Sequence, residues 1–294
     1  EALKTEDGDG NNVAVGYQAL KTLNAGADGN NTAIGYATGN SISTGTANTL
    51  MGAFAGDALT VGGHNVAMGY EALSTDTQGS HSTAIGRRAL KTQNFTSATD
   101  SHNTAIGNNA GLSITTGVQN TILGSNTADA LTSGQYNTAL GYKALSLDTQ
   151  GNRAVAIGYE ALANQNFTSS TDNINTAVGF HAGKEITTGA ENTIMGGEAG
   201  DALTVGNQNV AIGVQALSTD QNGSRNVAIG ATALKVQEAT GSVSNNFYNI
   251  AVGYGAGLAI TDSYYNTIVG SNAMNVATTG NTFNTVLGIN AAND

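Results

Sequence analysis

The sequence contains no cysteine, no proline and no tryptophan, and only six phenylalanines among its 294 residues. Without cysteine the chain can form neither a disulfide framework nor a thiolate metal site. Charged residues make up 11% of the chain and 40 residues are glycine, so large side chains are too few to fill the wide interior of a globular domain. A thin core remains possible, because alanine, valine, isoleucine and leucine recur along the whole chain.

The balance of charge and hydropathy limits the partners that the chain can have. Lys and Arg number 10 against 21 Asp and Glu, which gives a formal net charge of -11. Because binding to a phosphate backbone needs clustered Lys and Arg, we expect no nucleic-acid partner. No apolar run approaches the roughly 18 residues of a membrane-spanning helix, so we expect no membrane insertion by this segment. The chain begins within a repeat, at Ala2-Leu3, and we expect it to be a piece of a longer protein.

A five-residue motif, Asn-(Thr/Val)-(Ala/Ile)-(Ile/Val/Leu/Met)-Gly, recurs sixteen times with few departures. Its glycine never varies, and its asparagine is replaced only at Ser82 and Ala154. The third position is larger once in every four copies, at Leu50, Ile122, Ile194 and Ile268, where we expect different packing.

The spacing of the motif has two periods. Most copies follow each other after 17 residues, but steps of 21 precede Gly107 and Gly179 and a step of 23 precedes Gly253. Four copies therefore form a larger unit of 72 residues. We interpret the chain as one repeat domain, 1–294, whose larger units lie at about 31–102, 103–174 and 175–248, with a partial unit at 249–294.

Each motif is short, rich in β-branched residues and flanked by turn formers, which is typical of a strand between two turns. A helix is the weaker interpretation, because a 17-residue repeat that holds two glycines leaves little room for one. A unit this short cannot bury its own apolar side, so successive copies must stack about 4.8 Å apart. The sequence predicts an all-β fold, a parallel β-solenoid or β-roll of about 16 short coils.

Side chains alternate between the two sides of a strand, which places Asn31, Ala33 and Gly35 on one side and Thr32 and Ile34 on the other. We expect both sides to be at least partly buried. The glycine suits a turn with positive φ or a close backbone approach, and the asparagine can form a ladder of side-chain amides. We assign these structural roles to Asn31, Ala33, Ile34, Gly35, Asn103, Gly107, Asn175 and Gly179.

The segment Asn137-Thr-Ala-Leu-Gly-Tyr-Lys-Ala-Leu145 and its copies resemble the head domains of trimeric autotransporter adhesins and related viral and phage tail-fibre repeats. The resemblance covers essentially the whole chain. It implies a left-handed parallel β-roll, three of which pack around a threefold axis as a homotrimer. The coils here are longer than in those heads and show a 72-residue period, which fits a fibre shaft equally well.

A catalytic site should stand out from the repeat, because a reaction needs one set of converging groups. We find none, and expect no enzyme activity, no catalytic residue, no cofactor and no metal-binding residue. The histidines are His64, His81, His102 and His181. The first three directly precede the motif asparagine or serine, and we interpret them as surface residues without an acidic partner at metal-ligand spacing.

One aspartate recurs in each larger unit, as Asp57, Asp129 and Asp201. In a trimer these residues could form rings of carboxylates that hold calcium. The glycine-rich nonapeptide of calcium-binding β-rolls and the EF-hand loop are both absent, so we favour a structural role for these aspartates.

The long fourth coil of each larger unit predicts a loop pushed outward from the solenoid, where binding residues are often found. An aromatic residue beside asparagine marks each loop. An exposed ring of this kind could stack on a sugar; the alternative is a hydrophobic plug folded over the edge of the coil. The candidate surface-binding residues are Asn94, Phe95, Asn166, Phe167, Asn246 and Phe247.

The function that we expect is fibrous attachment by a homotrimer, either an adhesin head or the shaft or receptor-binding region of a tail fibre. Its partners would be copies of itself and a glycan or protein receptor on a cell surface, and its location extracellular, on a cell surface or a virion. Two alternatives are an ice-binding solenoid, suggested by the Thr at the second motif position, and a mechanical spacer that binds nothing. The Val that replaces this Thr in several copies fits a buried position better than an ice-binding one.

Overall fold

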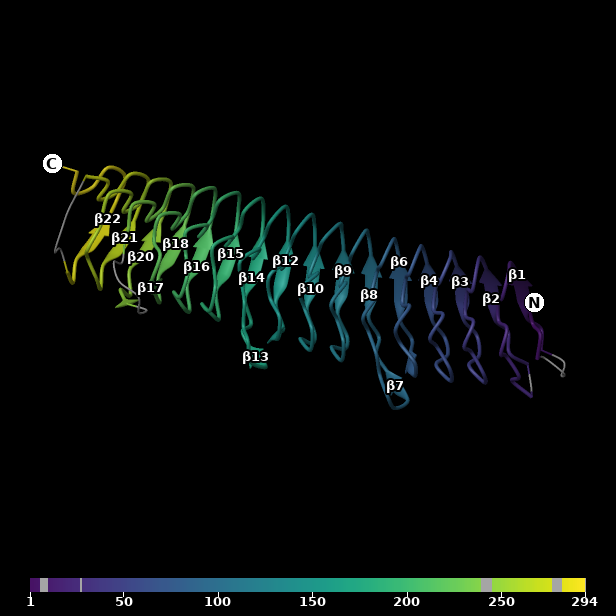
Figure 1. Cartoon of the computed structure of the whole chain (residues 1–294). Coiled ribbons are helices and arrows are strands. Elements are labelled where there is room, and N and C mark those ends of the chain that lie inside the picture. The colour runs from purple at the N-terminus through teal and green to yellow at the C-terminus, as the bar shows by residue number, and fades with distance from the viewer. Residues whose placement is uncertain (6–9, 27, 239–244, 277–281, 294) are drawn as a thin grey trace. The chain divides into compact units, whose positions relative to one another are not determined.

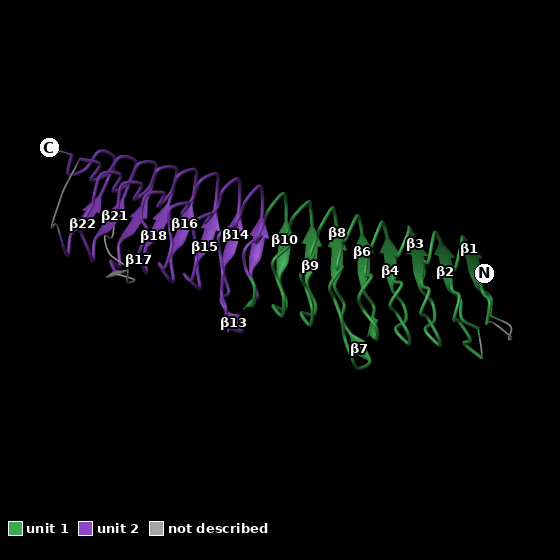
Figure 2. Cartoon of the chain, viewed as in Figure 1, with its two compact units in different colours: residues 1–143, 149–151 green, residues 144–148, 152–294 purple. Residues whose placement is uncertain are grey.

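A computed structural model describes residues 1–5, 10–26, 28–238, 245–276 and 282–293. They form two compact units, residues 1–143 with 149–151 and residues 144–148 with 152–294 (Figure 2). All regular structure in the described residues is β-strand. This part of the chain therefore holds no helix that could cross a membrane. Residues 239–244 of the expected unit 175–248 and residues 277–281 of the partial unit lie outside the described residues.

The first unit contains eight strands that coincide with the motif. They are β1 (Val13–Val15), β2 (Thr32–Ile34), β3 (Thr49–Met51), β4 (Val66–Met68), β6 (Thr83–Ile85), β8 (Thr104–Ile106), β9 (Thr121–Leu123) and β10 (Thr138–Leu140). The second unit contains eight more, β12 (Val155–Ile157), β14 (Thr176–Val178), β15 (Thr193–Met195), β16 (Val210–Ile212), β18 (Val227–Ile229), β20 (Ile250–Val252), β21 (Thr267–Val269) and β22 (Thr285–Leu287).

Six two-residue strands lie between the motif strands. They are β5 (Gly79–Ser80), β7 (Thr99–Asp100), β11 (Gly151–Asn152), β13 (Thr171–Asp172), β17 (Gly223–Ser224) and β19 (Asn245–Asn246). Strand β5 pairs in parallel with β7, and β17 with β19. Figure 1 shows β7 and β13 at one edge of their coils, away from the motif strands.

Each motif strand pairs in parallel with the next motif strand of its own unit, and equivalent motif positions lie opposite each other. Strands β2 and β3, for example, align Thr32 with Thr49 and Ala33 with Leu50. In the second unit, β15 and β16 show the same register. Figure 1 shows the strands of a unit side by side, joined by turns that all run round the same way. A parallel β-solenoid with a repeat of about 17 residues is therefore confirmed.

The alternation of the strand places the motif asparagine and alanine in the interior of the coil. Asn31 and Ala33 are fully buried, whereas Thr32 and Ile34 are only partly covered. The expected assignment of these residues to two sides is confirmed. The expectation that both sides are at least partly buried is met in many strands, β2 among them, whereas in others, such as β3, the second side is exposed.

The buried asparagines form a ladder of amides along each unit. The Asn120 amide nitrogen donates to the carbonyl of Gly134 at 2.9 Å, and its side-chain oxygen accepts a bond from the backbone N–H of Asn137 at 3.0 Å. The same two bonds recur at Asn192, toward Gly206 and Asn209. Each asparagine thus ties two coils together and satisfies polar backbone groups that water cannot reach.

The invariant glycine is required for two reasons. Its φ is positive in every copy, +140° at Gly107 for example, a conformation that L side chains rarely adopt. A Cβ on Gly107 would also lie 2.2 Å from the carbonyl oxygen of Gly124 in the next coil. The prediction of positive φ or a close backbone approach is confirmed, and both apply.

The larger third residue of β3 is accommodated by glycines in neighbouring turns. Leu50 is fully buried. A Cβ on Gly39 would lie 2.8 Å from one methyl group of Leu50, and a Cβ on Gly56 would lie 3.0 Å from the other. Where the strand carries alanine instead, as at Ala67, the turn contributes the buried Leu73. In the coils of β3 and β4, a larger residue on the strand is thus paired with a smaller one in the turn, and the reverse.

Candidate functional site

The outward side of the motif strands, formed by the second and fourth motif positions, is named here the strand face. The fourth position is apolar in all sixteen strands, and none of these side chains is buried. Their exposed fractions are 55% at Val15 and 47% at Met195, and they reach 76% at Leu287 in the last strand. The second position carries Thr or a β-branched apolar residue, and neither position carries a charge in any strand. Val13, at the second position, is 49% exposed, so the expectation that Val marks a buried site is not met within one chain.

Aromatic residues border the strand face on the side of the turn that follows the motif glycine. The rings of Tyr17 and Tyr36 stack at 5.5 Å, and Phe54 meets Tyr36 edge-on at 5.3 Å. In the second unit, Tyr159 stacks on Phe180 at 5.4 Å. The coil spacing of the solenoid brings equivalent side chains of successive coils into contact, so single residues become continuous rows.

The residues that directly precede the motif form a second row, on the opposite border of the strand face. His64 stacks on His81 at 4.9 Å, and His81 lies 5.2 Å from His102. The Nδ1 atom of His81 is 3.1 Å from Oδ1 of Asp100. The interpretation as surface residues is consistent with their exposure. The contact of His81 with Asp100 was not anticipated from the sequence. The described residues contain no group of three or more His, Asp or Glu arranged to hold a metal ion.

The long coils do not present their aromatic rings to solvent. Phe95 and Phe167 are 7% exposed and Phe247 is 3% exposed. The hypothesis of an exposed stacking ring is therefore wrong for this conformation, and the alternative of a hydrophobic plug describes all three residues. Their neighbours Asn166 and Asn246 are exposed and Asn94 is partly covered.

A buried carboxylate holds the Phe95 and Phe167 plugs in place, which sequence reasoning missed. Oδ1 of Asp76 accepts the backbone N–H of Phe95 at 3.1 Å, and Oδ2 accepts the amide nitrogen of Gln93 at 2.6 Å. The amide oxygen of Gln93 in turn accepts a bond from Asn103 at 2.9 Å, so Gln93 enters the interior beside Ser82. The recurrence of Asp76 at 72-residue intervals was the signal that could have revealed this network.

The second long coil repeats the arrangement. The third repeats only the pair of aspartate and glutamine, because the backbone N–H of Phe247 donates to the carbonyl of Ser224 at 3.1 Å. Gln165 donates to Asp148 at 2.5 Å and accepts a bond from Asn175. Gln237 donates to Asp220 at 2.7 Å. These three aspartates are fully buried, and the hydrogen bonds described here compensate their carboxylates for the lost water.

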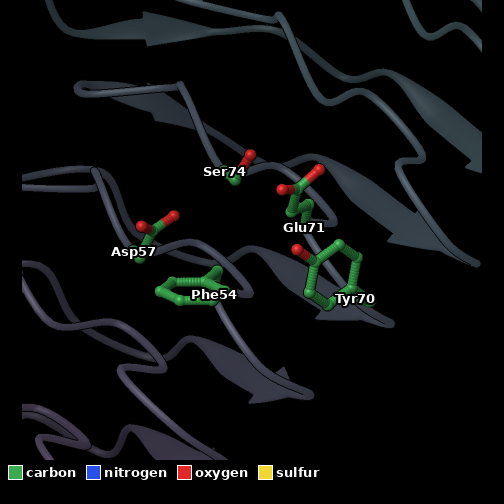
Figure 3. A pocket seen from close by; sticks show the side chains of 5 residues that line it. All are labelled: Phe54, Asp57, Tyr70, Glu71 and Ser74. Atoms are coloured by element: carbon green, nitrogen blue, oxygen red, sulfur yellow. The ribbon is translucent and has the colours of Figure 1, made fainter.

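The aspartates at 57, 129 and 201 lie in turns rather than in the interior. Burial raises the pKa of all three, to about 6 for Asp57. Asp57 lines a pocket of about 320 Å³ with Phe54, Tyr70, Glu71 and Ser74. Figure 3 shows the two rings on one side of this pocket and the carboxyl groups on the other.

The carboxylate of Glu71 is held by two cations. Nζ of Lys91 lies 2.7 Å and Nε of Arg88 2.9 Å from its Oε2. The ammonium of Lys91, followed by the guanidinium of Arg88, holds the pKa of Glu71 at about 2. This side chain therefore stays ionised, while its neighbour Asp57 carries no ion pair in the described structure.

Comparison with known proteins gives no further assignment. No known family, no curated protein and no solved structure matches the chain.

Proposed function

We propose that the chain is part of a trimeric fibrous attachment protein, an adhesin head or a tail-fibre region, which acts outside the cell through multivalent contacts with a cell surface. The observation that carries the proposal is the strand face. It extends along both units as an apolar row without a charged residue, although the interior of each coil is already filled.

An uncharged apolar face of this regularity is typical of an interface. Surfaces that stay in water are normally protected by charges, and interface cores are depleted of them. The charges of this chain instead lie in the turns, as at Glu71, Arg88 and Glu160. Covering the face would remove apolar area from water, which stabilises an assembly by about 25 cal/mol for each Å² of apolar surface buried.

A second copy of the chain is the partner that fits this face best. Its fourth-position residues recur at the same strand spacing, so rows from two copies keep in step along their length. A partner with another period would lose this match within a few coils. The resemblance to trimeric adhesin heads and tail-fibre repeats supports three copies, and a trimer would multiply weak receptor contacts into useful avidity.

The proposal is tested by attachment of the fluorescently labelled chain to intact cells. The variant Ile85→Glu/Ile106→Glu places charges on the strand face of the first unit, and Thr96→Glu/Thr168→Glu places them on exposed loops as a control. We expect the first variant to become monomeric and its attachment to fall by about 10²-fold or more through lost avidity. Attachment that is unchanged in a monomeric variant would contradict the proposal.

The exposure of the second motif position favours one other function. Thr49 and Thr121 are exposed on the same flat row, as a solenoid that binds ice would require. A thermal-hysteresis measurement separates the two proposals, because an attachment fibre should show none. Hysteresis that disappears in Thr49→Val/Thr121→Val would favour ice binding.

A further inference from the structure

The pocket beside Asp57 has one apolar wall made of two rings. Phe54 and Tyr70 meet edge-on, with ring centroids 6.2 Å apart and an angle of 85° between their planes. Tyr70 is 44% exposed, so part of its ring is open to a ligand. Because the ring planes are nearly perpendicular, the wall offers a corner of aromatic surface against which the C–H groups of a ligand can pack. Ligand pockets usually combine such a wall with a few polar groups.

The opposite wall contains an unsatisfied acceptor. Oδ1 of Asp57 is buried and receives no hydrogen bond from the described residues. Glu71, by contrast, is paired with Arg88 and Lys91. The carboxylate receives a hydrogen bond from its own backbone N–H, but Oδ1 has no donor. A buried acceptor without a donor is costly, so a ligand that brings a hydroxyl group to Oδ1 would offset part of that cost.

The charges around the pocket select against a charged ligand. The carboxylates of Asp57 and Glu71 are matched in number by the cations of Arg88 and Lys91. The site therefore has no net formal charge that would draw in an anion or a cation. The remaining polar lining groups are the hydroxyl of Ser74 and the hydroxyl of Tyr70, which hydrogen-bonds to Glu71.

We propose that this pocket is a subsite for a neutral saccharide, whose C–H groups pack in the corner between Phe54 and Tyr70 and whose hydroxyl groups donate to Asp57 and Glu71. The inference rests on the proposed attachment function, since it names the class of ligand. It differs from the predicted loop site, because the rings that form it belong to the turns after β3 and β4.

The equivalent turns of the other larger units provide internal controls. In the turn that contains Asp129, Asn126 occupies the position equivalent to Phe54, and Tyr142 the position equivalent to Tyr70. This turn therefore has one of the two rings. At Asp201 both rings are missing, and Val214 stands where Tyr70 does. The aspartate recurs in all three turns, but the wall of two rings occurs only at Asp57.

Binding to this subsite should depend on pH. A hydroxyl that donates to Asp57 favours the ionised carboxylate, whose pKa burial has raised to about 6. The charged groups that act on it are Glu71, which raises the pKa further, and Lys91, which lowers it. Affinity should therefore be about tenfold weaker at pH 5 than at pH 7, because the carboxylate is mostly protonated at the lower pH.

The probes are methyl glycosides of glucose, galactose, mannose and N-acetylglucosamine, with glucuronic acid and sialic acid as charged comparisons. Saturation-transfer NMR titrations with the full chain should show binding of at least one neutral glycoside. Tyr70→Ala and Asp57→Ala should weaken it about tenfold or more, and Asp57→Asn should abolish its pH dependence. Tyr142→Ala and Asp201→Ala, the matched controls, should leave binding unchanged.

The inference is overturned if no neutral glycoside binds, if the acidic sugars bind as well as the neutral ones, or if the controls weaken binding as much as the pocket variants. Circular dichroism of each variant shows whether it is folded. If Tyr70→Ala does not fold, the milder variant Asp57→Asn still tests the inference. Cell attachment by a trimer that binds none of these sugars would refute this subsite and leave the attachment function standing.

Discussion

At the scale of single residues, the interior depends on asparagine more than on large apolar side chains. The thin core cannot supply much apolar burial, so hydrogen bonds between coils contribute an unusual share of its specificity. Asn120 illustrates this, since it donates to Gly134 and accepts from Asn137 inside a fully buried ladder. Loss of one such side chain leaves backbone groups of two coils without partners.

We predict that Asn120→Ala lowers the free energy of unfolding by about 2 kcal/mol, because a buried carbonyl and a buried N–H lose their bonds. The matched control is Thr121→Ala, one residue further on the exposed strand face. Urea denaturation followed by circular dichroism measures both. Equal effects of the two substitutions would contradict the role given to the ladder.

Glycine provides a second test at this scale. Gly107 combines positive φ with a contact that a Cβ would violate, whereas a Cβ on Gly197 would meet nothing within 4 Å. Gly107→Ala should therefore destabilise the chain by at least about 2 kcal/mol, and Gly197→Ala should be nearly neutral. Thermal melting of the two variants measures the difference, and equal melting temperatures would rule out this explanation of the invariant glycine.

The raised pKa of Asp57 gives a stability effect with a definite sign. Its ordinary value is 3.8 and its value in the fold is about 6, so between these pH values the folded chain holds the proton more tightly than the unfolded chain. The stability of the wild type should therefore fall as pH rises from about 4 to about 6.

Asp57→Asn, which cannot ionise, should accordingly melt at a higher temperature than the wild type at pH 7.5 and at the same temperature at pH 4. Differential scanning calorimetry across this range measures the difference, with the exposed Asp262→Asn as control. A difference between Asp57→Asn and the wild type that does not change with pH would show that burial of this carboxylate has no effect on folding.

At the scale of elements, the long coils are anchored by plugs rather than opened for binding. The first two plugs combine a buried ring with a buried aspartate and glutamine, as in Phe95, Asp76 and Gln93. Because the chain is a stack of similar coils, such anchors act mainly on their own neighbours.

Phe95→Ala should cost about 3 kcal/mol of local stability, since it empties a site that the ring fills. Hydrogen exchange should show loss of protection at β5 and β7 while β2 and β3 keep theirs. Thr96→Ala, beside it and exposed, is the control. Unchanged protection at β5 and β7 would mean that the ring is not a plug.

The repeat, the strands and the two sides of each strand could be predicted from the sequence because they depend on local pattern and on the 17-residue period. The position of Phe95 could not, because an aromatic residue in a polar loop is equally compatible with exposure and burial. What decides between them is the carboxylate of Asp76, nineteen residues away. The pocket was missed for a similar reason, since its two rings belong to successive coils and meet only once these are stacked.

At the scale of the whole molecule, the strand face is the feature that the single chain does not explain. Each unit carries an apolar row without a charge, and the exposed members include Val15 and Leu123 in the first unit and Met195 in the second. A fibre of several chains would bury this row and leave the charged turns, the pocket and the long coils on the outside. The attachment proposal, the saccharide subsite and the fibrous character all depend on this arrangement.

Sedimentation equilibrium of the full chain tests the arrangement most directly. The account predicts a species of three times 29.5 kDa, which the strand-face variant Ile85→Glu/Ile106→Glu converts to single chains. A wild-type chain that sediments at 29.5 kDa at every concentration, with no change in the variant, would contradict it.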